Sequence, residues 1–174
     1  VQKLTDDRIY WIWLSTISGI GAKRFYKLME YYKSPRELYE APERELMQSS
    51  RILGQKCGRQ IVAARNEKAL RRAETILHMP DLRVVTLLCP EYPPLLKSIY
   101  DPPPVLYCKG RPLPAEGPAI AVVGSRRSSE YGRMAARKIS CQLARAGVAV
   151  ISGMARGIDT MAHKGALDAE NGYT

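Results

Sequence analysis

Two short segments of the sequence combine glycine, serine and arginine, the residue types that proteins use to hold phosphate groups. Glycine lets a backbone N–H approach a ligand closely, serine can donate a hydrogen bond, and arginine makes paired, charge-assisted bonds to an oxyanion. The candidate phosphate-binding residues are Gly124, Ser125, Arg126 and Arg127 in the first segment, and Ser152, Gly153, Arg156 and Gly157 in the second. Their chemistry is that of anion binding, and we assign no catalytic residue.

The flanking sequence predicts how these two segments come together. The apolar runs AIAVV (119–123) and VAVI (148–151) are typical of short strands, and a helix-like segment that begins near Tyr131 joins them. Such parallel crossovers are right-handed in nearly every case, which brings the carboxyl ends of both strands to one edge of the sheet. Ligands of open α/β sheets bind at that edge. We therefore expect a strand–helix–strand unit with both segments side by side.

A second glycine-containing turn lies near the N-terminus, between two stretches of helical periodicity. Gly19, Gly21 and Lys23 fall in the sequence ISGIGAK, which resembles the turn of a helix-hairpin-helix motif. In that motif, backbone N–H groups meet a DNA phosphate. The alternative is a tight connection that needs glycine only for its backbone freedom. These three residues are a secondary candidate for DNA contact.

The chain is strongly basic, which favours a polyanionic partner. It holds 27 Lys and Arg against 17 Asp and Glu in 174 residues, a net charge of +10. Nucleic acid is the usual partner of such a protein, and a merely basic globular protein is the alternative. Four scattered cysteines and two histidines lack the spacing of a metal site. With no membrane-length apolar run and no signal-peptide pattern, we expect a cytoplasmic protein with free thiols, no metal and no membrane partner.

Periodicity predicts an all-helical domain over residues 1–78, with one long helix from about residue 55 to Leu77. Residues 79–174 contain β-rich runs and prolines, and we expect them to form the N-terminal part of an α/β domain with a parallel sheet. Four residues should form the buried stripe of the crossover helix: Met134, Ala135, Ile139 and Leu143. We expect Asp159 to cap the helix that follows the second strand, and His163 to be packed and hydrogen-bonded.

Three ordered stretches of residues 82–174 resemble the DNA-processing protein A (DprA/Smf) family. They read YPPLLKSIYDPPPVLYCKG, AVVGSR and ISGMARGIDTMAHKGAL, and the helical domain before them also matches many members. The resemblance implies a helix-hairpin-helix or SAM-like helical domain followed by a Rossmann-like domain. It places the family's DNA-binding arginine on Arg126.

The resemblance also implies a function. Family members bind single-stranded DNA, protect incoming DNA, load a RecA-type recombinase in natural transformation, and form homodimers. None is established as an enzyme by its motifs. We therefore expect a DNA-binding protein without enzymatic activity or cofactor, with single-stranded DNA and a RecA-type recombinase as partners.

Two other classes of function stay open at this point. A nucleotide-binding sensor or nucleotide-processing enzyme could use the same Rossmann-like edge, and a scaffold could act only through protein partners. Against an ATPase, the stretch that mimics P-loop spacing has Arg137 where glycine is needed and Ile139 where serine or threonine is needed. Against a dinucleotide enzyme, the first turn reads GSRRSS rather than GxGxxG.

In the resembling family, the sheet continues past the position that matches Thr174. We therefore expect the Rossmann-like domain to be incomplete here, as in a truncated chain. An unpaired edge of a central strand invites association. The expected consequence is either self-association through that edge or a poorly ordered last helix.

Overall fold

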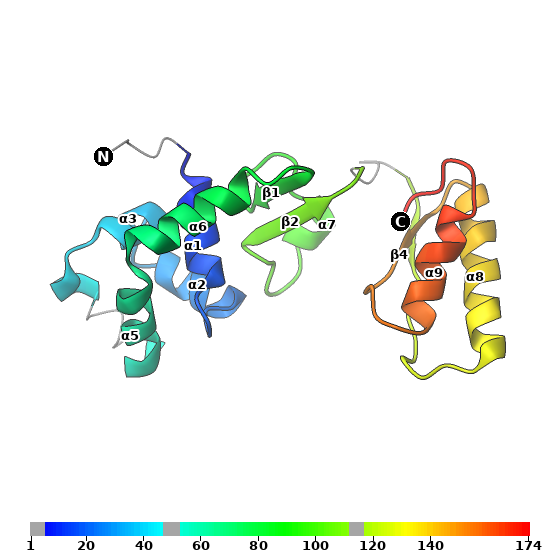
Figure 1. Ribbon diagram of the computed structural model, residues 1–174, viewed down its shortest axis with the longest axis horizontal. Helices are drawn as coiled ribbons and strands as arrows, with labels where there is room; N and C mark the ends of the chain where they lie inside the picture. The colour runs from blue at the N-terminus through cyan, green and yellow to red at the C-terminus, as the bar shows by residue number, and fades with distance from the viewer. Residues whose placement is uncertain (1–5, 47–52, 112–116) are drawn as a thin grey trace. The chain divides into compact units, whose positions relative to one another are not determined.

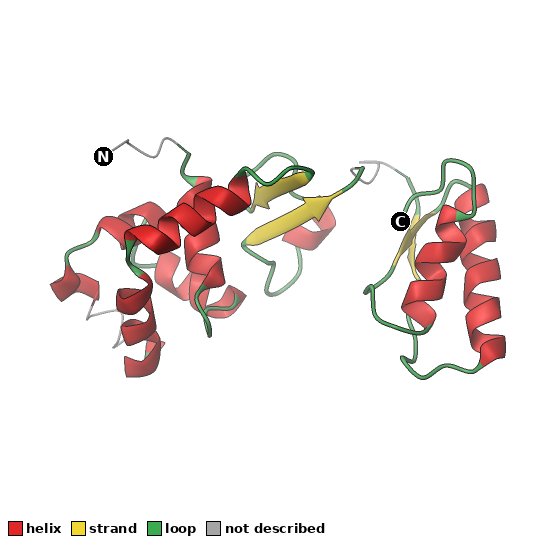
Figure 2. Cartoon of the chain, viewed as in Figure 1, coloured by secondary structure: helices red, strands yellow, loops and turns green. Residues whose placement is uncertain are grey.

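The structure of the chain is a computed structural model that describes residues 6–46, 53–111 and 117–174. The backbone divides into two compact units, residues 1–110 and residues 111–174. Both contain helices and short strands (Figure 2), so the predicted mixed α/β class is confirmed. Within the described ranges, no helix is long and apolar enough to cross a membrane.

Helices make up most of the first unit, drawn from blue to green in Figure 1. They are α1 (Arg8–Thr16), α2 (Ala22–Met29), α3 (Pro35–Glu40), α5 (Gln55–Ala64) and α6 (Glu67–Leu77). Their apolar faces enclose a core whose buried residues include Trp13, Phe25 and Leu38. The indole N–H of Trp13 donates to the carbonyl of Ala64 at 2.8 Å, which satisfies the only polar atom of this buried side chain.

The single long helix predicted between residue 55 and Leu77 is wrong, because the chain breaks at Arg65 and Asn66. Arg65 leaves helical geometry at φ −83° and ψ 78°. The side chain of Asn66 accepts a hydrogen bond from the N–H of Ala69 at 3.0 Å and so caps the next helix. An asparagine in this role competes with continuation of the preceding helix. Two helices, α5 and α6, therefore take the place of one.

An antiparallel hairpin completes the first unit. β1 (Leu82–Thr86) pairs with β2 (Val105–Lys109), and the short helix α7 (Pro94–Lys97) lies in their connection. Val84 and Val105 belong to the same buried cluster as the helices. The compact division after residue 110 therefore follows packing, whereas the predicted domains 1–78 and 79–174 follow the change from helices to strands. Those domain limits stay a prediction.

The second unit contains the predicted parallel crossover. β3 (Ala119–Ala121) pairs in parallel with β4 (Ala149–Ile151), and α8 (Glu130–Arg145) connects them. The next helix, α9 (Ile158–Leu167), packs beside α8 (Figure 1). The N–H of Val150 donates to the carbonyl of Tyr173 at 2.9 Å. Neighbouring residues of a strand point their N–H groups to opposite edges of that strand. The bond from Val150 therefore lies on the edge of β4 that faces away from β3, so β4 has a partner on each side.

The core of the second unit is small and rich in alanine. Its buried cluster consists of Ala144, Val150, Ala162, Ala166 and Ala169. A Cβ on Gly165 would lie only 2.1 Å from the carbonyl oxygen of Arg137, so α8 and α9 approach too closely for larger side chains at this point.

The predicted buried stripe of α8 is wrong, because none of its four members is fully buried. Met134 is 60% exposed and Ile139 is 51% exposed. The buried residues of α8 are instead Ala136, Ser140 and Ala144. Because small residues let α8 approach α9 closely, the larger apolar side chains are left outside the contact.

Candidate nucleic-acid interface

The two predicted segments form neighbouring turns, one after β3 and one after β4. The hydroxyl of Ser152 donates to the carbonyl of Val122 at 2.7 Å, which joins the two strand ends. The N–H of Ile158 donates to the carbonyl of Ser125 at 3.2 Å. The structure therefore brings together all eight residues of the primary candidate site on one edge of the short sheet.

Glycine is required in both turns because the turns pack on each other. Gly157 has φ +93°, and a Cβ there would lie 2.3 Å from the carbonyl oxygen of Ser125. A Cβ on Gly124 would lie 2.7 Å from a side-chain carbon of Ile158. No other residue fits these positions without displacement of the backbone or a branched side chain. The two turns are therefore fixed relative to each other.

The prediction that Asp159 caps α9 is wrong. The residue before the helix is Gly157, and Asp159 lies inside the first turn, where it is buried. Its carboxylate accepts hydrogen bonds from the N–H of Gly124 at 3.2 Å and the N–H of Ala155 at 3.4 Å. Sequence periodicity could not show this role, because it depends on the approach of two turns distant in the chain.

The position of Asp159 changes how an anion can bind at this edge. Its carboxylate already occupies the N–H of Gly124, one of the backbone donors that a phosphate would otherwise use. The hydroxyl of Ser125 accepts from the N–H of Arg127 at 3.1 Å, which leaves its own proton available to a ligand. Asp159 therefore leaves fewer backbone N–H groups to an anion, while the hydroxyl of Ser125 is still able to donate.

Three arginines supply the positive charge of this edge. Arg126, Arg127 and Arg156 are exposed, and within the described residues none forms an ion pair. Arg137 of α8 provides a contrast, since its guanidinium is held by Asp168. Arginines without an internal partner keep all their N–H donors for an external oxyanion.

Two apolar side chains at this edge were missed by the sequence reasoning. Met154, in the second turn, is 83% exposed and has φ +55°, a conformation that a large side chain seldom adopts. Val123, two residues after the end of β3, is 67% exposed. The only available signal was their place just after the strands. They add apolar surface beside the arginines.

His163 of α9 is packed as predicted, but only one of its ring nitrogens has a hydrogen-bond partner among the residues that the structure describes. Its Nδ1 lies 2.5 Å from the hydroxyl oxygen of Thr174. Its Nε2 is buried without a hydrogen bond to any residue that the structure describes. His163 does not take part in the contacts between the two turns.

The secondary candidates lie in the first unit. Gly19 has φ +83°, and its carbonyl accepts a hydrogen bond from Arg24 at 2.6 Å. Gly21 precedes α2 without a side-chain cap. The amine of Lys23 lies 3.6 Å from a carboxylate oxygen of Asp101 and 5.2 Å from the ring centre of Tyr100. The turn between α1 and α2 is present, and its identity as a helix-hairpin-helix stays a prediction.

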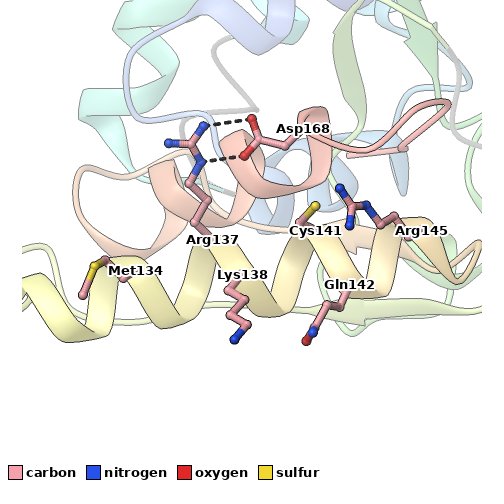
Figure 3. A pocket seen from close by; sticks show the side chains of 7 residues that line it. All are labelled: Met134, Arg137, Lys138, Cys141, Gln142, Arg145 and Asp168. Atoms are coloured by element: carbon pink, nitrogen blue, oxygen red, sulfur yellow. Dashed lines mark hydrogen bonds and ion pairs between the residues drawn. The ribbon is translucent and has the colours of Figure 1, made fainter.

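A separate groove of about 360 Å³ runs along α8 (Figure 3). Its lining residues are Met134, Arg137, Lys138, Cys141, Gln142, Arg145 and Asp168. Arg137 donates two hydrogen bonds to Asp168, at 2.5 and 2.9 Å, and thereby lowers the pKa of that carboxyl. None of the eight residues in the two turns lines this groove, so it is not part of the candidate interface.

Comparison with known proteins assigns the family. Residues 83–174, more than half of the chain, match the family described as DNA recombination-mediator protein A. The chain belongs to this family. The DNA recombination-mediator match includes the β1–β2 hairpin as well as both turns of the candidate interface.

Individual members of the family extend the match. A protein named Smf from Synechocystis is 30% identical over 173 residues, which are 97% of this chain and 43% of the relative. DNA processing protein DprA from Bacillus subtilis is 37% identical over 90 residues, 51% of this chain and 30% of the relative. The chain thus spans less than half the length of these two relatives.

The fold also matches a solved structure of the family. The X-ray structure of DNA processing protein A from Streptococcus pneumoniae resembles this chain with a TM-score of 0.63 at 27% identity. The match covers 95% of this chain and 55% of that one. The predicted mixed α/β fold class and the predicted family are therefore confirmed.

Proposed function

We propose that this chain binds single-stranded DNA at the edge formed by the turns after β3 and β4. The observation that carries the proposal is the set of three exposed arginines, Arg126, Arg127 and Arg156, on two turns held together by close glycine packing. A polyanion gains from cations carried on a backbone that is already fixed, because little backbone order is lost on binding. The net charge of +10 supports the same class of ligand.

In this proposal the protein acts in DNA processing without catalysing a reaction. It protects incoming single strands in the cytoplasm and loads a RecA-type recombinase onto them in natural transformation, as part of a homodimer. The name of the relative DNA processing protein DprA and the description of the matched family, DNA recombination-mediator protein A, support this role. The chemistry of the edge agrees, since it offers anion-binding groups.

The decisive experiment measures the affinity of this chain for a fluorescein-labelled oligothymidylate by fluorescence anisotropy. Arg126→Ala should weaken binding about tenfold, because a charge-assisted contact to a phosphate is lost. Arg145→Ala is the matched control, because Arg145 is exposed at the C-terminal end of α8, whereas the turn that carries Arg126 leads into the N-terminal end of that helix. Equal affinity of the wild type and Arg126→Ala would contradict the proposed site.

A nucleotide screen separates this function from the nucleotide-sensor or nucleotide-processing alternative. Thermal unfolding would be followed with ATP, GTP and their monophosphates, beside oligothymidylate. Stabilisation by the oligonucleotide alone supports the proposal, because a ligand that binds only the folded state raises the melting temperature. Stabilisation by a mononucleotide without any affinity for single strands would favour the alternative.

The recombinase role has its own test. On single strands already coated by a single-strand-binding protein, a RecA-type recombinase begins to hydrolyse ATP only after a lag. A loader should shorten this lag. The wild-type chain should act in this assay and Arg126→Ala should not. If Arg126→Ala shortened the lag as much as the wild type does, loading would not depend on the proposed DNA site.

A further inference from the structure

The first unit presents an exposed aromatic side chain that the proposed interface does not use. Proteins that hold single strands combine cations with aromatic rings on which bases stack. Near the two turns, the only aromatic residue close in sequence is Tyr131. In the first unit, by contrast, Tyr100 is 88% exposed, the largest exposed fraction among the exposed large apolar and aromatic side chains of the described structure.

Tyr100 stands on a backbone that is fixed from several sides. The hydroxyl of Tyr26 donates to the carbonyl of Pro102 at 2.6 Å, and the hydroxyl of Tyr92 donates to the carbonyl of Pro103 at 2.7 Å. Tyr92 itself is buried. The prolines at 102–104 also restrict the chain. A base that stacks on Tyr100 would therefore meet a ring whose support is already ordered.

The surroundings of the ring suit a negatively charged strand. The amine of Lys23, from α2, lies 5.2 Å from the centre of the Tyr100 ring. Lys97, three residues before Tyr100, is exposed and makes no ion pair within the described part of the chain. The nearby acid Asp101 contacts Lys23 at 3.6 Å, but both side chains are partly open to solvent. Such an exposed ion pair is weak and can yield to a phosphate.

We propose that Tyr100 is a stacking platform for a base of single-stranded DNA, with Lys23 placed to contact a neighbouring phosphate. This inference rests on the proposed function, because it takes the same class of ligand. It adds a base contact to the phosphate contacts of the arginines. It also assigns a role to the exposed part of the YDPPP segment, whose other residues anchor the hairpin connection.

The test uses the whole chain and the same labelled oligothymidylate. Tyr100→Ala should weaken binding about tenfold, the effect typical of one lost base–aromatic stack. Tyr100→Phe should bind like the wild type, because the ring is kept. Tyr31→Ala is the matched control, since Tyr31 is another exposed tyrosine of the same unit, 64% exposed. Lys23→Ala should reduce the salt dependence of binding.

Two further measurements separate stacking from indirect effects. On an abasic strand of the same length, Tyr100→Ala and the wild type should bind equally, because no base is present to stack. A strand that carries 5-iodouridine should cross-link to the peptide containing Tyr100 on irradiation. The stacking role of Tyr100 would be wrong if Tyr100→Ala still lost tenfold in affinity on the abasic strand, or if the cross-links formed only to other peptides.

Failure of this inference can be told apart from failure of the proposed function. If Arg126→Ala weakens binding and Tyr100→Ala does not, the stacking role is wrong and the arginine edge stands. If the wild-type chain does not bind the oligothymidylate, the proposed function is wrong and the inference falls with it. Loss of affinity in both variants, with normal binding by Tyr31→Ala, supports both.

Discussion

At the scale of single residues, Gly157 combines a positive φ with a close backbone neighbour, so it is poorly able to accept a side chain. Gly157→Ala would place a methyl group 2.3 Å from the carbonyl oxygen of Ser125, at a φ of +93°. The clash and the backbone strain together should lower the free energy of unfolding by about 3 kcal/mol or more. Urea unfolding followed by circular dichroism would measure the loss.

Gly147→Ala is the control for that substitution. Gly147 also has a positive φ, +77°, but no atom lies within 4 Å of the position its Cβ would take. Only the conformational cost of about 1 kcal/mol should appear. If both alanine variants lost the same stability, the contact between the two turns would not be what constrains Gly157.

Residue types alone predicted which side chains gather at the edge of the sheet, but not what each of them does. Arg126 and Arg156 were predicted as phosphate ligands, and their exposure leaves that role available. The close approach of Gly157 to the neighbouring turn was not predicted, because it depends on the tertiary structure. Asp159 has a role that depends entirely on the tertiary structure, because its partners come from both turns.

At the scale of elements, the pair of Arg137 and Asp168 ties α8 to the end of α9. Arg137 lowers the pKa of Asp168 in the folded protein. A carboxyl whose pKa is depressed on folding stabilises the protein above its unfolded pKa, and that contribution is lost as the pH falls through its folded pKa. The pair should therefore support the second unit at neutral pH, begin to weaken as the pH falls below about 4, and be lost as the pH falls through the lower pKa of Asp168 in the folded protein.

Asp168→Asn tests this coupling. Melting temperatures measured from pH 7 to pH 3 should fall less steeply for Asp168→Asn than for the wild type, because the variant has no carboxylate to protonate there. Glu170→Gln is the control, since Glu170 is an exposed acid that makes no ion pair with any described residue. Parallel curves for the wild type and Asp168→Asn would show that the ion pair adds nothing.

Elements were predicted well where a local pattern is sufficient. The two parallel strands and their crossover helix followed from apolar runs and turn residues, and all three are present. The helix break at Asn66 was missed, because a local cap prevailed over continuous periodicity. The exposure of Met134 and Ile139 was missed because it depends on how closely α8 approaches α9, which no pattern within α8 contains.

At the scale of the whole molecule, the excess of basic residues should dominate how DNA binding responds to salt. Each phosphate contact to a single strand contributes about 0.7 to the slope of log K against log salt concentration. The triple variant Arg126→Ala, Arg127→Ala, Arg156→Ala should therefore lower the magnitude of the slope by about 2. Anisotropy titrations at several salt concentrations would measure it.

The control for the salt slope removes equal charge elsewhere. Arg72→Ala, Arg133→Ala and Arg145→Ala together delete three exposed arginines that are not among the residues of the two turns. If this variant flattened the slope as much as the first, binding would follow net charge alone rather than the arginines of the edge.

The close packing of the two turns also indicates how this edge could be redesigned. Gly124 and Gly157 form the fixed frame, and substitutions there would disturb the backbone. Arg126, Met154 and Arg156 project from that frame and are exposed. A combinatorial library confined to Arg126 and Arg156 should yield mostly folded variants, so directed evolution toward a new anionic ligand could proceed without rebuilding the scaffold.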